Sequence, residues 1–115
     1  MARLGIDFGT SNSGVAVMAG NRPYAIPMEP GEQTLPTAVF VDFADQKYVY
    51  GSAAARAMMA GAEGRFMRAL KSILGKPLAR EPRRLLNEKL TLIEVIARFL
   101  AELKARAEAG TGMTF

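Results

Sequence analysis

Short apolar runs separated by turn residues fill the first half of the chain and predict β-strands. These runs occupy residues 3–8, 14–19, 22–28, 35–42 and 47–50. Gly20 and Asn21, between the second run and the third, have the residue types of a two-residue hairpin turn. Pro23 and Pro27 lack the amide hydrogen that a strand ladder needs, so the third strand is expected at a sheet edge. The pattern predicts a three-stranded β meander followed by further short strands.

The apolar positions change to helical spacing in the second half of the chain. An alanine-rich stretch at 52–60 predicts one short helix. Residues 65–74 place apolar side chains three and four positions apart, which predicts a second helix. Residues 76–90 are basic, contain Pro82 and show no clear period. The change from strands to helices predicts one α/β domain over residues 1–115.

The last helix has the clearest pattern. Thr91 and Glu94 have the spacing of a capping box. A broad apolar face follows, made of Leu92, Val95, Ile96, Phe99, Leu100 and Leu103. Outside this face, Glu94 is four residues before Arg98 and Glu102 is four residues before Arg106, so two ion pairs along the helix are expected.

The composition is that of a globular protein, with 50% hydrophobic and 23% charged residues. The chain has no cysteine and no histidine, so the sequence excludes disulfides, thiol nucleophiles, zinc sites and histidine-dependent triads. Any catalysis must use backbone amides, hydroxyls, lysine, a few carboxylates and a hard cation such as magnesium.

The net charge of +4 is concentrated in the second half, where residues 63–115 carry eleven basic and six acidic side chains. Glutamates are interleaved with these basic residues and no aromatic cluster accompanies them, which favours a solvated surface over a nucleic-acid interface. No leader and no apolar run of about 20 residues is visible, so no membrane partner is expected. Together with the lack of cysteine, this predicts a cytoplasmic protein.

Candidate chemistry is concentrated in the segment LGIDFGTSNSGVAV at 4–17. Gly9 allows close approach of the backbone, and Thr10, Ser11 and Asn12 supply side-chain donors, so the turn between the two strands resembles a phosphate-binding nest. The pattern also suggests that Asp7 is buried beside this turn. A carboxylate there would repel phosphate unless magnesium, holding most of its waters, lay between them.

Two other interpretations apply to this turn. Gly9 and Gly14 have the glycine spacing of a P-loop, but Val15 stands where lysine is required and a strand follows instead of a helix. An ordinary tight hairpin without a ligand also fits these residue types and stays open.

Segment 4–17 resembles the first phosphate-binding hairpin of the actin-like ATPase superfamily, in particular of the 70-kilodalton heat-shock chaperone family. Three further stretches resemble that family in the same order: GEQTLPTAVFV at 31–41, YVYGSAAARAMMAG at 48–61 and RFMRALKSILG at 65–75. The resemblance implies a partial ribonuclease H-like, actin-like ATPase lobe, the N-terminal part of a nucleotide-binding domain. Ser11 stands where the main branch usually has threonine, which suggests a divergent branch.

The resemblance also assigns roles. Asp7 would be a catalytic residue that holds magnesium through water. Contacts to the β and γ phosphates of ATP would come from Gly9, Thr10, Ser11 and Asn12. Lys71 would face the attacking water as a catalytic residue, although from its neighbours alone it is a solvated lysine. Unfolded client proteins and co-chaperones would be the partners of the full-length protein.

The resemblance covers only the opening portion of such a domain, so the second phosphate loop is expected beyond Phe115. The full-length protein is expected to be an ATPase, and this stretch alone is expected to be inactive. A sugar kinase of the same superfamily and a stand-alone interaction module are the alternatives. The first strand should be bare on one edge, so the isolated chain is expected to self-associate.

Overall fold

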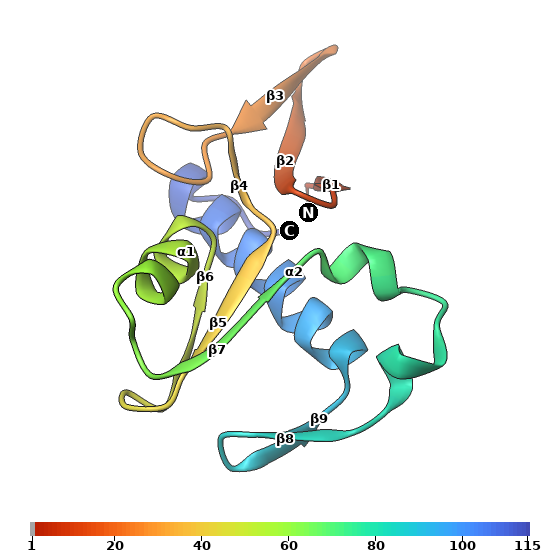
Figure 1. Cartoon of the computed structure of the whole chain (residues 1–115). Helices are drawn as coiled ribbons and strands as arrows, with labels where there is room; N and C mark the ends of the chain where they lie inside the picture. The colour runs from red at the N-terminus through yellow and green to blue at the C-terminus, as the bar shows by residue number, and fades with distance from the viewer. Residues whose placement is uncertain (1) are drawn as a thin grey trace.

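Nine strands, two α-helices and two short 3₁₀ helices build residues 2–115, the part of the chain that the computed structural model describes (Figure 1). The strands are β1 (Gly5–Phe8), β2 (Asn12–Ala19), β3 (Arg22–Ile26), β4 (Thr34–Pro36), β5 (Ala38–Asp42), β6 (Lys47–Tyr50), β7 (Gly64–Arg68), β8 (Arg83–Leu85) and β9 (Glu88–Leu90). The helices are α1 (Ser52–Met59), η1 (Leu70–Ile73), η2 (Pro77–Arg80) and α2 (Leu92–Thr111), where η marks 3₁₀ geometry. The architecture is the mixed α/β type that the sequence predicts.

The first three strands form the antiparallel meander that the sequence predicts. β2 pairs with β1 along one edge, and β3 and β4 share its other edge. Gly20 and Asn21 connect β2 to β3, with Ala19 paired to Arg22 across the turn. Within residues 2–115, β3 has no second strand neighbour, which confirms its expected edge position. β1 is likewise paired on one side alone in this part of the chain.

The strand predicted at 35–42 is in fact two strands in different sheets. β4 pairs with β2, whereas β5 lies between β6 and β7 in a second sheet. The break is at Thr37, whose backbone N–H donates to the carbonyl oxygen of Ser11 at 2.9 Å. β5 is buried along most of its length and is therefore apolar. Its residues continue the apolar run of β4, so the sequence gives no sign of the break between the two strands.

The prediction of a helix at 65–74 is wrong. The first half of this segment is β7, which pairs antiparallel with β5, and a single 3₁₀ turn, η1, follows. Met67 belongs to the main core and Phe66 packs with the smaller cluster against α1, as expected of neighbours in a strand. Ala69 then takes the left-handed conformation with φ 54°, which separates β7 from η1. The apolar spacing of a short segment fits both a helix and a strand. Here pairing with β5 favours the strand.

The basic segment at 76–90 contains η2 and a hairpin of β8 and β9, which forms a separate two-stranded sheet. The capping box predicted for α2 is confirmed, because Thr91 Oγ1 accepts the N–H of Glu94 at 3.1 Å and Glu94 Oε1 accepts the N–H of Thr91 at 3.0 Å. Among residues 2–115, no helix combines the length and the apolar composition that crossing a membrane would need.

Only one of the two predicted ion pairs along α2 forms. Arg106 Nε lies 2.7 Å from Glu102 Oε2, as predicted, but Arg98 pairs across to Glu88 of β9 at 2.7 Å. The guanidinium of Arg98 also lies 4.9 Å from the ring centre of Tyr48 in β6. The hydrogen bond from Arg98 lowers the pKa of the Glu88 carboxyl below its ordinary value. Glu94 is engaged in the helix cap, and the hairpin supplies Arg98 with a partner that spacing along the helix does not reveal.

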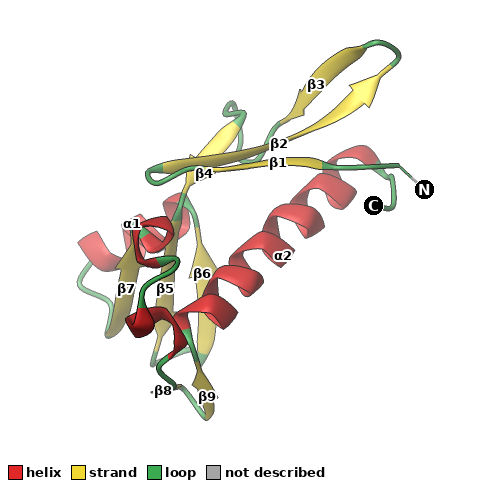
Figure 2. Ribbon diagram, turned by 90° about the vertical axis from the view of Figure 1, so that its right-hand side faces the viewer, coloured by secondary structure: helices red, strands yellow, loops and turns green. Residues whose placement is uncertain are grey.

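Helix α2 joins the two larger sheets. It runs beneath the sheet of β1 to β4 and continues past β5 and β6, as Figure 2 shows. Phe99, which is fully buried, contacts both regions: its ring centre lies 6.1 Å from that of Phe8 and 6.3 Å from that of Tyr50. The core side chains of α2 are Leu92, Val95, Ile96, Phe99, Leu103 and Ala107. Most of the predicted apolar face is therefore confirmed, with Leu100 only partly buried.

Candidate functional site

The turn between β1 and β2 is built around Gly9. A Cβ atom at this position would overlap the backbone carbonyl oxygen of Asn12, so the close approach of Gly9 to β2 excludes every larger residue. The turn thereby keeps Thr10 and Ser11 exposed between two strands that are fixed by pairing.

A hydrogen bond between two buried hydroxyls links the turn to the start of the second sheet. Ser13 Oγ and Thr37 Oγ1 lie 2.6 Å apart, and the two residues are 1% and 2% exposed. The nearby bond between the N–H of Thr37 and the carbonyl of Ser11 adds a second link at the break between β4 and β5. Sequence reasoning did not single out Thr37, since a lone threonine in an apolar run carries no signal of such a partner.

Thr10 and Ser11 line a pocket of about 230 Å³ together with Arg68 and Ala69 at the end of β7. Arg68 is exposed, and none of the ion pairs among residues 2–115 includes it. Two hydroxyl residues and an arginine among the lining residues make this pocket suited to an anion. Nothing in the sequence marks Arg68 as a site residue, because a helix over residues 65–74 offers no reason to place it beside the turn.

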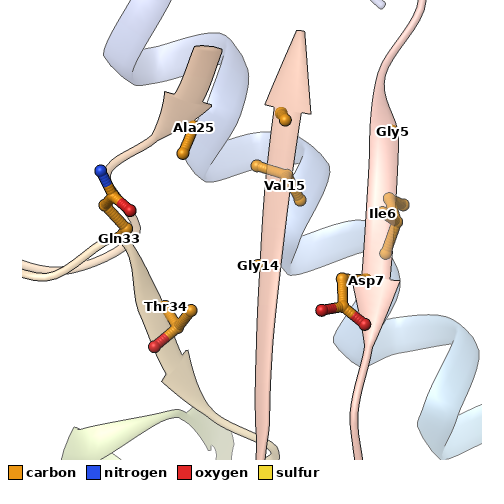
Figure 3. Close-up of a pocket in the computed structure, with 9 residues that line it drawn as sticks. Gly5, Ile6, Asp7, Gly14, Val15, Ala25, Gln33 and Thr34 are labelled. Carbon is orange, nitrogen blue, oxygen red and sulfur yellow. The ribbon is translucent and has the colours of Figure 1, made fainter. Parts of the chain in front are cut away.

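Asp7 is exposed, which corrects the expectation that it is buried. It lies on the outer face of the first sheet, in the row where Asp7 pairs with Gly14 and Gly14 with Thr34 (Figure 3). These residues, with Gly5 and other small side chains, line a pocket of about 410 Å³ on the side of the sheet away from α2. β1 has a strand neighbour on one side alone among residues 2–115, so its central carboxylate reaches solvent.

Lys71 is exposed in η1, beside the buried Leu70. It lies two residues after Ala69, which lines the smaller pocket, but Lys71 itself is not among the residues that line either pocket. Asn12 begins β2 and is likewise exposed and outside both linings. The structure thus brings Thr10 and Ser11 together with Arg68 and leaves Asp7 in a neighbouring pocket.

The residues near the turn are better suited to a divalent cation that keeps its water ligands than to one that several side chains bind directly. Within residues 2–115, no three histidine, cysteine, aspartate or glutamate side chains cluster as metal ligands would. Asp7 offers one accessible carboxylate, and magnesium commonly keeps several waters and takes one or two carboxylates together with phosphate oxygens. The donor set fits magnesium only when a phosphate ligand completes the shell.

Comparison with known proteins identifies the family. The model of the Hsp70 protein family matches residues 3–84, and the chain belongs to that family. It is 31% identical over 109 residues to the chaperone protein DnaK of Ureaplasma urealyticum serovar 10, and equally to that of Ureaplasma parvum serovar 3. Each match covers 95% of this chain and 17% of the relative, so the chain spans about a sixth of the length of these proteins.

Family membership agrees with the architecture, which is a partial actin-like ATPase lobe. It also favours the Hsp70 family over the sugar kinases of the same superfamily, since the family model matched is that of Hsp70.

Proposed function

We propose that this chain is the phosphate-binding N-terminal portion of a heat-shock-70-like chaperone ATPase and that its first hairpin contacts the phosphates of ATP. The observation that carries the proposal is the pocket that Thr10 and Ser11 line together with Arg68, beside a turn that only glycine can form. Membership of the Hsp70 family supports the choice of ATP as the anion.

Each residue has a physical task in this proposal. Thr10 and Ser11 donate hydroxyl hydrogen bonds to phosphate oxygens, and the turn supplies backbone N–H groups to the same oxygens. Arg68 balances the negative charge in the same pocket. Asp7 would hold magnesium through its water molecules, and a bound magnesium would supply charge neutralisation at the transferred phosphoryl group. Lys71, two residues after Ala69, orients the attacking water.

The chain alone should bind ATP weakly and hydrolyse it no faster than background, because phosphoryl transfer depends on groups positioned on both sides of the nucleotide. We therefore expect the amides of residues 9–13 to shift in NMR spectra during a titration with ATP and magnesium, and calorimetry to give a dissociation constant far above micromolar. Submicromolar affinity would contradict the inactive-fragment part of the proposal.

Arg68→Gln tests the pocket directly. We expect it to weaken ATP binding about tenfold or more, as loss of one charge-assisted contact implies. Arg65→Gln is the matched control, since Arg65 is also exposed in β7 but does not line the pocket. Equal effects of both variants would show that general charge, and not the pocket, attracts the nucleotide.

The catalytic assignment needs a polypeptide that joins this stretch to the rest of an Hsp70 ATPase domain. There, Lys71→Ala should reduce turnover and leave ATP binding nearly unchanged, and Asp7→Asn should weaken the magnesium dependence of both. Lys76→Ala, at another exposed lysine, serves as the control. Wild-type turnover of Lys71→Ala would remove Lys71 from the mechanism. Client proteins and co-chaperones as partners, and a cytoplasmic location, belong to the same proposal.

A further inference from the structure

The corner between β7 and η1 has a backbone conformation that its residue disfavours. Ala69 has φ 54° and ψ 33°, which is the left-handed region. A residue with a Cβ is strained there because the Cβ lies too close to the following carbonyl oxygen, whereas glycine adopts the region freely. Such a conformation persists only where the surrounding structure imposes it, and such positions are concentrated at functional sites.

Two buried side chains impose the corner from either side. Met67 in β7 is 6% exposed, Leu70 at the start of η1 is 4% exposed, and both belong to the main core. β7 stays paired with β5 as far as Arg68, so the chain leaves the strand and returns a side chain to the core within two residues. The carbonyl oxygen of Ala69 then accepts the N–H of Ser72 at 3.0 Å and its hydroxyl at 2.7 Å. The corner is therefore held by packing and by hydrogen bonds.

The same corner connects the two basic residues of the proposed phosphate site. Arg68 comes directly before Ala69, and both line the pocket of Thr10 and Ser11. Lys71 comes two residues after Ala69, within η1. Because φ and ψ of a residue set how the chain before it is directed relative to the chain after it, the conformation of Ala69 decides how Lys71 lies relative to Arg68.

Alanine restricts this corner more narrowly than glycine would. With a Cβ, the left-handed region is a small well, at φ of about 50–70° and ψ of about 30–60°, whereas glycine has a broad range of positive φ. Both dihedral angles of Ala69 fall inside that well. The strain of an alanine at this position is thus accompanied by a sharply defined direction of the chain on either side.

We propose that Ala69 is a positioning residue, whose strained backbone holds Arg68 and Lys71 in the directions that phosphate binding and attack by water require. This inference rests on the proposed function. It implies two effects of opposite sign when Ala69 becomes glycine: the fold becomes more stable, because the strain is relieved, and the site binds and turns over ATP less well. A residue that served only the fold would not lower ATP binding while raising stability.

Ala69→Gly in the 115-residue chain tests both signs. The urea midpoint should rise by about 0.5 M, since relief of the left-handed strain outweighs the greater freedom of glycine in the unfolded chain. The dissociation constant of ATP with magnesium, measured from the NMR shifts of the amides of residues 9–13, should increase about threefold. In a polypeptide that joins this stretch to the rest of an Hsp70 ATPase domain, kcat should fall about tenfold and KM should change less, because small displacements of a reacting group mainly slow the chemical step.

Gln46→Gly is the matched control. Gln46 has the same backbone conformation, with φ 53°, but lies in the exposed turn between β5 and β6 and does not line the pocket. Its replacement should raise the urea midpoint by a similar amount and leave the dissociation constant and turnover of ATP at their wild-type values.

The outcomes separate this inference from the proposed function. If the wild type binds ATP and Ala69→Gly binds and turns it over equally well, the inference is overturned and the proposed function stands. A lower urea midpoint for Ala69→Gly would also overturn the inference, because it would mean that Ala69 is not strained, and so would an equal loss of ATP binding in Gln46→Gly. If ATP shifts no amide of residues 9–13 in the wild type, the proposed function is overturned, and the inference with it.

Discussion

The buried hydroxyl pair of Ser13 and Thr37 allows a sharp test of how the phosphate hairpin is held. Thr37→Val keeps the shape of the side chain and removes its hydroxyl, which leaves Ser13 Oγ buried without its partner at 2.6 Å. An unsatisfied buried hydroxyl costs about 1–3 kcal/mol. Ser13→Ala leaves Thr37 Oγ1 in the same position and should cost a similar amount.

The double variant should cost clearly less than the sum of the two single variants. With both hydroxyls gone, no unpaired polar atom remains, so the free energy of unfolding should fall by about as much as in one single variant. The coupling energy in this cycle then equals the cost of one single variant, about 1–3 kcal/mol. Residues separated by 24 positions in sequence have no local reason to couple, so this energy reports the contact between the two sheets.

Urea denaturation followed by circular dichroism gives these energies. A chain of this size has a slope of about 1–2 kcal/mol per molar urea, so each single variant should lower the midpoint by about 1 M. Ser72→Ala is the control: its hydroxyl donates to the carbonyl of Ala69 at an exposed position, and the midpoint should change little. Additive losses in the double variant would refute the reasoning, because they would mean that the hydroxyls do not depend on each other.

Two further predictions concern positions outside the hairpin. Gly51→Ala should lower the free energy of unfolding by at least about 2 kcal/mol. Gly51 has φ 71°, and a Cβ there would lie 2.8 Å from Glu29 Oε2 and 2.9 Å from Leu35 Cδ1. Gly61→Ala is the control: Gly61 has φ 75° but faces open space, so the same urea titration should show about half the loss. The pKa of Glu88 is lowered from 4.5 in the folded protein, so the stability it contributes is present above pH 4.5 and is lost as the pH falls through the folded pKa. Thermal unfolding across that range should show the wild type losing its advantage over Glu88→Gln, and a constant difference at low pH would contradict the pairing with Arg98.

The local elements that depend on short-range chemistry were predictable. The capping box at Thr91 and Glu94, the turn at Gly20 and Asn21 and the helix α1 follow from bonds or conformations formed within a few residues. The edge position of β3 also follows from the chain alone, because proline lacks an amide hydrogen wherever it is placed.

For the candidate site, the residue types in the turn indicated a phosphate nest; the structure shows that Gly9 lies tightly against the backbone of Asn12, and phosphate binding there stays a prediction. The sequence did not show which basic side chain would line the pocket. Arg68 lies beside Thr10 and Ser11 because β7 pairs with β5 and ends at the level of the turn. No spacing within residues 65–74 contains that information.

What the sequence by itself determined is the meander, the final helix, the glycine-dependent turn and the family to which the chain belongs. Only the tertiary structure decided that residues 65–74 begin as a strand, that the run at 35–42 breaks at Thr37, and that Asp7 is exposed. The physical reason is the same in all three cases. A short apolar segment is compatible with either period and with either degree of burial. What decides between them is how the segment pairs in the fold: with β5 for β7, with Ser11 for Thr37, and, among residues 2–115, with β2 alone for the strand that holds Asp7.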